Sequence, residues 1–247
     1  MPRFKLTIEY DGTSFVGWQR QDNGPSVQAA VEAALKAYCQ ADITVFVAGR
    51  TDAGVHALGQ VAHADIPRDD TAEVVANAIN AHLRPNPVAV ISAERVADDF
   101  HARFSAIERQ YEYRIVNRRA PLTLDRDRAW SIPGPLNAAA MHDAAQVLTG
   151  KHDFTSFRAS ACQADSPVRT LDELSVTRQA DDIVVCARAR SFLHHQVRNI
   201  VGTLTLVGEG KWVKTDVAAA LAARDRSKAG PTAPAAGLCL VAVKYPA

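Results

Sequence analysis

The chain has 247 residues, of which 47% are hydrophobic and 22% are charged, a balance that excludes an intrinsically disordered chain and predicts a substantial core. Its formal net charge is only +1, so any surface for a nucleic acid must come from local clustering of basic side chains. The four cysteines stand apart with no C-x-x-C pair, which argues against a zinc ribbon and a disulfide framework. With no signal-peptide pattern and no apolar run of about 20 residues, we expect a cytoplasmic protein.

The first hundred residues predict a regular succession of strands and helices. Ser26 stands before a pattern of apolar residues with helical spacing and is expected to cap that helix, and Thr71 is expected to open a second helix. The predicted strands cover residues 3–10, 43–48, 59–66 and 87–96, and the predicted helices cover 27–38 and 71–82. The order β-α-β-β-α-β is the ferredoxin-like pattern.

The second half repeats that order without repeating the sequence. Strands are predicted over residues 104–117, 168–178, 183–191 and 238–245, and helices over 136–148, 194–207 and 216–223. We therefore predict an α+β protein of two topologically similar ferredoxin-like halves, residues 1–104 and 105–247, with abutting antiparallel or mixed sheets and a central active-site cleft. The Pro- and Gly-rich segment 227–237 is expected to be a mobile loop near that site.

Asp52 is the only acidic residue in "ITVFVAGRTDAGVHALGQVAHA", residues 43–64. A turn or capping aspartate is the ordinary interpretation, and a catalytic carboxylate is the alternative. Arg50 lies in the same short turn, and the apolar neighbours predict burial, where an unpaired carboxylate is costly.

Arg198 lies in a long segment that contains no acid. Residues 183–208 contain three arginines, and Arg198 is at the edge of the apolar face of a predicted helix. Either the Arg198 guanidinium reaches water at the edge of the core, or it is buried and requires a carboxylate from elsewhere in the chain.

Aromatic and basic residues gather after residue 100. Tyr111 and Tyr113 point to the same face of one predicted strand, where they either belong to the core or offer a ring for a base to stack on. Residues 103–128 hold seven arginines against four acids, which favours an RNA partner.

Motifs for metal or phosphate binding are weak or missing. The stretch "YDGTSFVGWQRQ" has no Lys-Ser/Thr after its second glycine, which excludes a P-loop. His194 and His195 are expected to point about 100° apart on a helix and so not to share a metal. We predict neither a metal nor an organic cofactor.

The motif "GRTDAGVHA", residues 49–57, resembles the signature of the tRNA pseudouridine synthase A family, whose members act on uridines of the tRNA anticodon stem-loop. Further segments resemble the family in the same order. They are "YDGTSFVGWQRQ" (10–21), "DDFHARFSA" (98–106), the Tyr111/Tyr113 strand, "DFTSFR" (153–158), "FLHHQVRNIVGTL" (192–204) and "GLCLVAVKYP" (237–246).

The resemblance implies a role for each of several residues. Asp52 is expected to be the essential carboxylate, acting as nucleophile or base, and Tyr111 to stack on the target base. Arg198 is expected to pair with that aspartate, Arg50 to lie near the displaced nucleotide, and Leu238 to form an apolar wall of the uracil pocket. Arginines within three of the motifs are expected to contact the RNA: Arg20, Arg103 and Arg158.

The resemblance also implies a reaction and partners. It indicates an isomerase that flips uridines at positions 38–40 out of the anticodon arm and converts them to pseudouridine without metal or cofactor. It further indicates a homodimer. Gln110 departs from the family pattern, because some members carry a basic residue there, and it places one phosphate contact in doubt.

The sequence leaves two other functions open. A non-catalytic RNA-binding module would use the same basic and aromatic surface but would not need Asp52. An aspartate-dependent hydrolase would need a second acid or base near Asp52, for which Asp65 and Glu108 are candidates.

Overall fold

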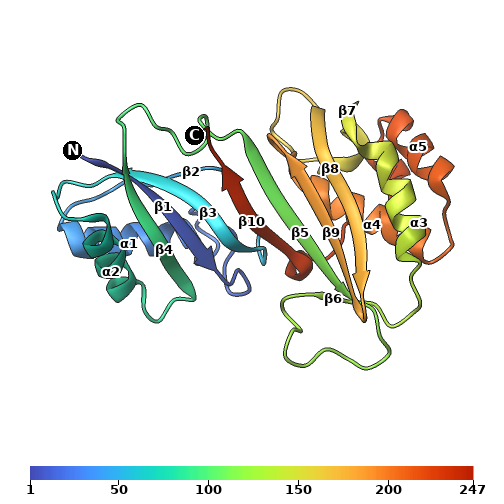
Figure 1. Cartoon of the computed structure of the whole chain (residues 1–247), viewed down its shortest axis with the longest axis horizontal. Helices are drawn as coiled ribbons and strands as arrows, with labels where there is room; N and C mark the ends of the chain where they lie inside the picture. The colour runs from blue at the N-terminus through green and yellow to red at the C-terminus, as the bar shows by residue number, and fades with distance from the viewer. Residues whose placement is uncertain (247) are drawn as a thin grey trace. The chain divides into compact units, whose positions relative to one another are not determined.

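The computed structural model describes residues 1–246, whose ten strands and five α-helices form an α+β protein, the class that the sequence predicts (Figure 1). Backbone contacts divide the described chain into two units. The first comprises residues 1–107 and 239–246, and the second comprises residues 108–238. The boundary lies close to the expected division at 104/105, but the segment after residue 238 groups with the first unit.

The sheet of the first unit is built around β1 (Arg3–Tyr10). This strand pairs antiparallel with β3 (His56–Asp65) on one side and with β4 (Val88–Val96) on the other. On the far side of β3, β10 (Leu238–Lys244) pairs in parallel and the short β2 (Phe46–Val47) pairs antiparallel.

Two capped helices cover one face of this sheet and pack side by side, α1 (Val27–Cys39) and α2 (Ala72–Leu83) (Figure 1). The hydroxyls of Ser26 and Thr71 accept the backbone N–H groups of the residues three positions later. The Ser26 cap confirms the prediction, whereas Thr71, expected as the first residue of its helix, is the cap residue before it. Alternate residues of β1 (Phe4, Leu6, Ile8 and Tyr10) are buried, so the apolar side of the strand lies in the core.

The second unit has an antiparallel sheet in the order β5 (Glu108–Val116), β9 (Asp182–Ala189), β8 (Val168–Gln179) and β7 (Gly150–Asp153), with β6 (Trp130–Ser131) beside β5. Its helices are α3 (Ala138–Ala145), α4 (Gln196–Gly208) and α5 (Lys214–Ala223). Helix α4 packs against β5 and α3, and most of its residues are buried.

The structure differs from the sequence prediction at several element ends. The strand expected over residues 43–48 retains only Phe46 and Val47, and residues 101–105 form turns before β5 begins. The helix expected over 136–148 ends at Ala145 and continues as a 3-10 turn, Gln146–Leu148. Strands β6 and β7 were not predicted, because two and four residues are too few for periodicity to show. Within residues 1–246, every helix is too short or too polar to cross a bilayer.

Candidate active site

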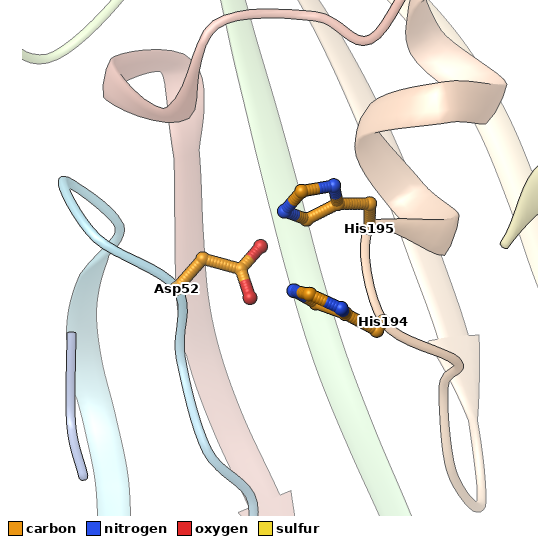
Figure 2. Close-up of side chains that lie close together, drawn as sticks. All are labelled: Asp52, His194 and His195. Atoms are coloured by element: carbon orange, nitrogen blue, oxygen red, sulfur yellow. The ribbon is translucent and has the colours of Figure 1, made fainter. Parts of the chain in front are cut away.

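Asp52 lies in the connection that leads from β2 into β3 (Figure 2). Its carbonyl accepts the N–H of Val55 at 3.1 Å, and Gly54 adopts a positive φ of 75°, so the chain turns tightly after the aspartate. Asp52 is half-buried, which makes it more accessible than the interior position that the apolar neighbours predict. A half-buried carboxylate on a tight turn is open to a substrate while its backbone is held.

The loop after β1 fastens the Asp52 turn from one side. The N–H of Trp18 donates to the carbonyl of Thr51 at 3.0 Å, and the N–H of Gly54 donates to the carbonyl of Phe15 at 3.3 Å. Gly17 bridges to Asp52 through its backbone and has a φ of 109°. A Cβ atom on Gly17 would lie 2.6 Å from the carbonyl oxygen of Thr51, so only glycine permits this approach. The "GTSFVGW" segment therefore shapes the site through its backbone.

A buried hydrogen-bond network holds the same turn from the other side. The hydroxyls of Tyr10 and Thr51 lie 2.7 Å apart, and Gln60 donates from Nε2 to the Tyr10 hydroxyl at 3.3 Å and to the carbonyl of Gly49 at 2.8 Å. All three side chains are buried, and burial raises the pKa of the Tyr10 hydroxyl well above its ordinary value. Both ends of the turn at residues 49–52 are thus tied to β1 and β3.

His56, the first residue of β3, anchors the end of β1 next to this network. Its Nδ1 accepts the N–H of Gly12 at 3.1 Å and lies 3.3 Å from a carboxylate oxygen of Asp11. A Cβ on Gly12 would lie 2.0 Å from the carbonyl oxygen of Val55, so the two chain segments touch directly. The sequence assigns no positioning role to Thr51, Gln60 or His56. Their occurrence within or just after the "GRTDAGVHA" motif is the signal that could have identified them.

In the second unit, Tyr111 and Tyr113 occupy the same face of β5, as the spacing predicts. The ring of Tyr111 lies edge-on to Phe192, with centroids 5.2 Å apart and an interplanar angle of 89°. Tyr113 is fully buried, and its hydroxyl donates to the carbonyl of Pro234 at 2.8 Å. Burial raises the pKa of Tyr113, and the positive charge of Arg198 acts in the opposite direction. Tyr111 is also buried, with 9% of its surface exposed against 0% for Tyr113, so it is the more accessible of the two rings.

Arg198 lies in the first turn of α4 and is half-buried, between the two positions that the sequence left open. Its Nε donates to the carbonyl of Ala233 at 2.8 Å. Leu238, at the start of β10, is buried. The second unit therefore contains an oriented guanidinium, an aromatic ring on β5 and an apolar side chain.

The premise that His194 and His195 point apart on a helix is wrong, because α4 begins only at Gln196. His195 is the N-cap residue and adopts the left-handed conformation, with φ 61° and ψ 7°. This turn brings the two imidazole rings side by side, with centroids 4.0 Å apart (Figure 2). A non-glycine residue in this conformation is strained, and such strain is common near functional sites.

Comparison with known proteins identifies the family. The sequence pattern of the family described as tRNA pseudouridine synthase matches residues 6–105 and 144–246. The chain belongs to this family. A protein of Rhodospirillum centenum named tRNA pseudouridine synthase A is 63% identical over 245 residues, which cover 99% of this chain and all of that protein. The proteins of the same name from Paramagnetospirillum magneticum and Parvibaculum lavamentivorans are 62% and 60% identical, over 100% and 99% of this chain and 96% and 100% of their own lengths.

Membership of the tRNA pseudouridine synthase family makes the chain an isomerase that acts on uridine in tRNA. The two other functions considered from the sequence, a non-catalytic RNA-binding module and an aspartate-dependent hydrolase, do not fit this family. Asp65 moreover forms a structural ion pair with Arg3, at 2.7 Å, which holds the pKa of the Asp65 carboxyl below its usual value. Because β3 spans ten residues at about 3.3 Å each, Asp65 lies roughly 30 Å from the start of the strand and the Asp52 turn.

The four arginines expected near the RNA have different surroundings. Arg50 is exposed, and among residues 1–246 its side chain forms no hydrogen bond or ion pair. Arg20 forms an ion pair with the nearly buried Glu32. Arg103 is exposed with its guanidinium over the ring of Phe104. Arg158 is half-buried near Asp153, whose pKa is lowered mainly by hydrogen bonds from Thr155 and to a smaller extent by the charges of Arg224 and Arg158.

Proposed function

We propose that this protein converts uridine to pseudouridine in the anticodon stem-loop of tRNA, at positions 38–40, with Asp52 as the essential carboxylate. The observation that carries the proposal is the way in which hydrogen bonds fix the turn on which Asp52 lies. A half-buried acid stands on a turn that is tied by hydrogen bonds on both sides, within the "GRTDAGVHA" motif. A reacting group needs to be held in a fixed position in this way. An aspartate that only ends a turn does not need such support.

The chemistry suits a site with one carboxylate and no cofactor. The C1′–N1 bond of uridine breaks and a C1′–C5 bond forms, the proton on C5 leaves, and N1 gains a proton. No redox equivalent or outside nucleophile is consumed. Asp52 serves either as the nucleophile that holds one fragment or as the base that removes a proton.

The target base must leave the helical stack before it can react, at a cost of a few kcal/mol. In this proposal Tyr111 stacks on the flipped base, Leu238 forms an apolar wall of the uracil pocket, and Arg50 lies near the displaced nucleotide. Arg198 pairs with Asp52. Basic side chains that contact the phosphates offset the cost of flipping: Arg20, Arg103 and Arg158.

This function requires a particular arrangement of the chain. The proposal includes a ferredoxin-like topology for each half, residues 1–104 and 105–247, with abutting sheets and a central cleft for the nucleotide. The β-α-β-β-α-β order of the first unit supports this part of the proposal. We also expect a cytoplasmic homodimer that works without metal or organic cofactor.

The test uses unmodified tRNA and maps pseudouridine chemically at nucleotide resolution. The wild-type protein is expected to modify uridines of the anticodon arm, and Asp52→Asn is expected to abolish turnover while tRNA binding stays within about twofold. Asp42→Asn, at an exposed aspartate of the same unit, is the matched control and should retain full activity. Loss of binding together with activity in Asp52→Asn would assign the residue a structural role.

A further inference from the structure

The residue proposed to pair with Asp52 is held at two points by one other residue. The Nε of Arg198 donates to the carbonyl of Ala233 at 2.8 Å, and the N–H of Ala233 donates to the carbonyl of Arg198 at 3.1 Å. Ala233 is buried, although it lies in the Pro- and Gly-rich segment. The orientation of the Arg198 guanidinium therefore depends on where this segment is fixed.

Asn199, the next residue of α4, fixes the segment to the helix. Its side chain is fully buried, and its Oδ1 accepts the Thr232 hydroxyl at 2.7 Å and Nη2 of Arg226 at 3.1 Å. Its Nδ2 donates to the carbonyl of Phe157 at 2.8 Å. One amide thus joins α4, the turn of the "DFTSFR" motif and both ends of the segment 226–232.

A second contact lies one turn further along α4. The hydroxyl of Thr203 donates to the carbonyl of Asn199 at 2.8 Å and accepts the N–H of Gly230 at 2.9 Å. A Cβ on Gly202 would lie 1.8 Å from the carbonyl oxygen of Pro231, so the segment rests directly on the helix backbone. The segment expected to be a mobile loop is therefore anchored along the face of α4 formed by residues 198, 199, 202 and 203.

We propose that Asn199 is a positioning residue for pseudouridine formation, which it supports by holding the segment 226–233 and, through Ala233, the guanidinium of Arg198. The inference rests on the proposed function, because it takes Arg198 as the partner of Asp52. Asn199, Thr203 and Arg226 form a brace for this segment: Thr203 accepts the N–H of Gly230 from α4, and Arg226 donates to the carbonyl of Gly230 within the segment itself.

The choice of asparagine at position 199 favours a role in positioning Arg198 over a role in packing the core. Asparagine is a poor residue for a helix interior, and an apolar side chain of similar size would satisfy a packing role without needing buried partners. Here Oδ1 of Asn199 accepts two hydrogen bonds and Nδ2 donates one. The two bonds to Oδ1 fix the segment that contains Ala233, whose carbonyl accepts the Nε of Arg198. Outer residues that orient metal ligands typically contribute tenfold to a hundredfold to activity, and a misplacement of about 1 Å can cost about a hundredfold, so we expect an effect of this size here.

The test compares two threonines of α4, Thr203, which is hydrogen-bonded to the segment, and Thr205, which is hydrogen-bonded within the helix. Thr203→Val removes the bond to Gly230 with little change of volume, and Thr203→Ser restores it. Thr205→Val is the matched control, because Thr205 is also buried in α4 but donates only to the helix carbonyl of Gly202, at 2.9 Å. Asn199→Leu tests the central residue directly, and the threonine variants stand in for it if it does not fold.

Two readouts are measured below the melting temperature of every variant. Thr203→Val should lower kcat on tRNA by about tenfold to a hundredfold with KM and tRNA affinity within about twofold of wild type. Hydrogen exchange at the amides of Gly230 and Ala233 should become at least about tenfold faster. Thr203→Ser should behave as wild type in both readouts, and Thr205→Val should lose stability but keep kcat.

Equal losses of kcat in Thr205→Val and Thr203→Val would overturn the inference, and so would faster exchange in Thr203→Val with unchanged kcat. If wild-type protein makes no pseudouridine in tRNA, the proposed function fails instead. Exchange at Gly230 and Ala233 would still report whether the brace exists.

Discussion

The hydroxyl groups of Tyr10 and Thr51 lie 2.7 Å apart in the core of the first unit. Thr51 is the residue directly before Asp52, the proposed catalytic aspartate. Gln60 donates to the same tyrosine oxygen, so Tyr10 joins β1 to the Asp52 turn and to β3. Because an aspartate has few rotamers of its own, the backbone on which it stands largely decides where its carboxylate lies. The precision of the site therefore depends on residues that need not touch RNA.

Tyr10→Phe removes one hydroxyl from this network and leaves Thr51 Oγ1 without its buried partner. We expect the free energy of unfolding to fall by about 1–3 kcal/mol and kcat to fall with tRNA affinity close to wild type. Urea unfolding and pseudouridine mapping measure the two effects. Tyr38→Phe, which loses a bond to Asp70 outside the site, should lose stability only.

Gly17→Ala places a methyl group against the carbonyl oxygen of Thr51, where it would lie at 2.6 Å. The backbone at residues 51–52 must move to admit it, so we expect lower kcat as well as lower stability. Gly210→Ala separates the two causes, because Gly210 also has a positive φ but has open space around it. The control should cost about 1–2 kcal/mol and leave kcat unchanged. Equal activity in the two variants would contradict the close-approach argument.

His63 makes the stability of the first unit dependent on pH. Burial, with smaller effects of His101 and Arg3, lowers the pKa of His63 from 6.5 to about 4. Its Nδ1 accepts the N–H of Ala102 at 3.1 Å, which requires the neutral ring. The unfolded chain binds the proton more readily, so stability is fully present above about pH 6.5 and is lost as the pH falls towards 4, by up to about 3 kcal/mol.

Urea unfolding at pH 7.5 and pH 5 measures this loss. His63→Gln keeps an oxygen that can accept the Ala102 N–H but does not titrate, so part of the difference between the two pH values should disappear. An unchanged pH dependence in the variant would show that other groups cause it.

Arg50→Ala tests the arginine nearest to Asp52 in the sequence. Because Arg50 is exposed and forms no ion pair within residues 1–246, we expect a change in stability of no more than about 0.5 kcal/mol. Turnover on tRNA should nevertheless fall, since its proposed place is beside the displaced nucleotide. Arg84→Ala, at an exposed arginine that ends α2, is the control for general loss of positive charge. A similar loss of turnover in both variants would count against a specific role for Arg50.

Periodicity and end signals in the sequence alone determined most of the elements. β1 matches its prediction residue for residue, and α1 begins where Ser26 predicts and extends one residue further, because alternation and capping are local properties of the chain. The isolated acid within "GRTDAGVHA" identified Asp52 as the candidate, and the order of the motifs identified the family. These signals need no knowledge of what lies next to what in space.

Only the tertiary structure showed what holds the candidate residues. No pattern in the sequence connects Tyr10 with Thr51 and Gln60, which are hydrogen-bonded in the structure. Nor does any local pattern indicate that Asn199 joins α4 to a segment some 30 residues away. The strand predicted over 43–48 is too long, the strand predicted from residue 104 begins too early, and the left-handed His195 was predicted as helical, because packing against distant segments overrides local preference there. Hydrogen bonds between residues far apart in the chain depend on the fold, and this protein uses them to position both Asp52 and Arg198.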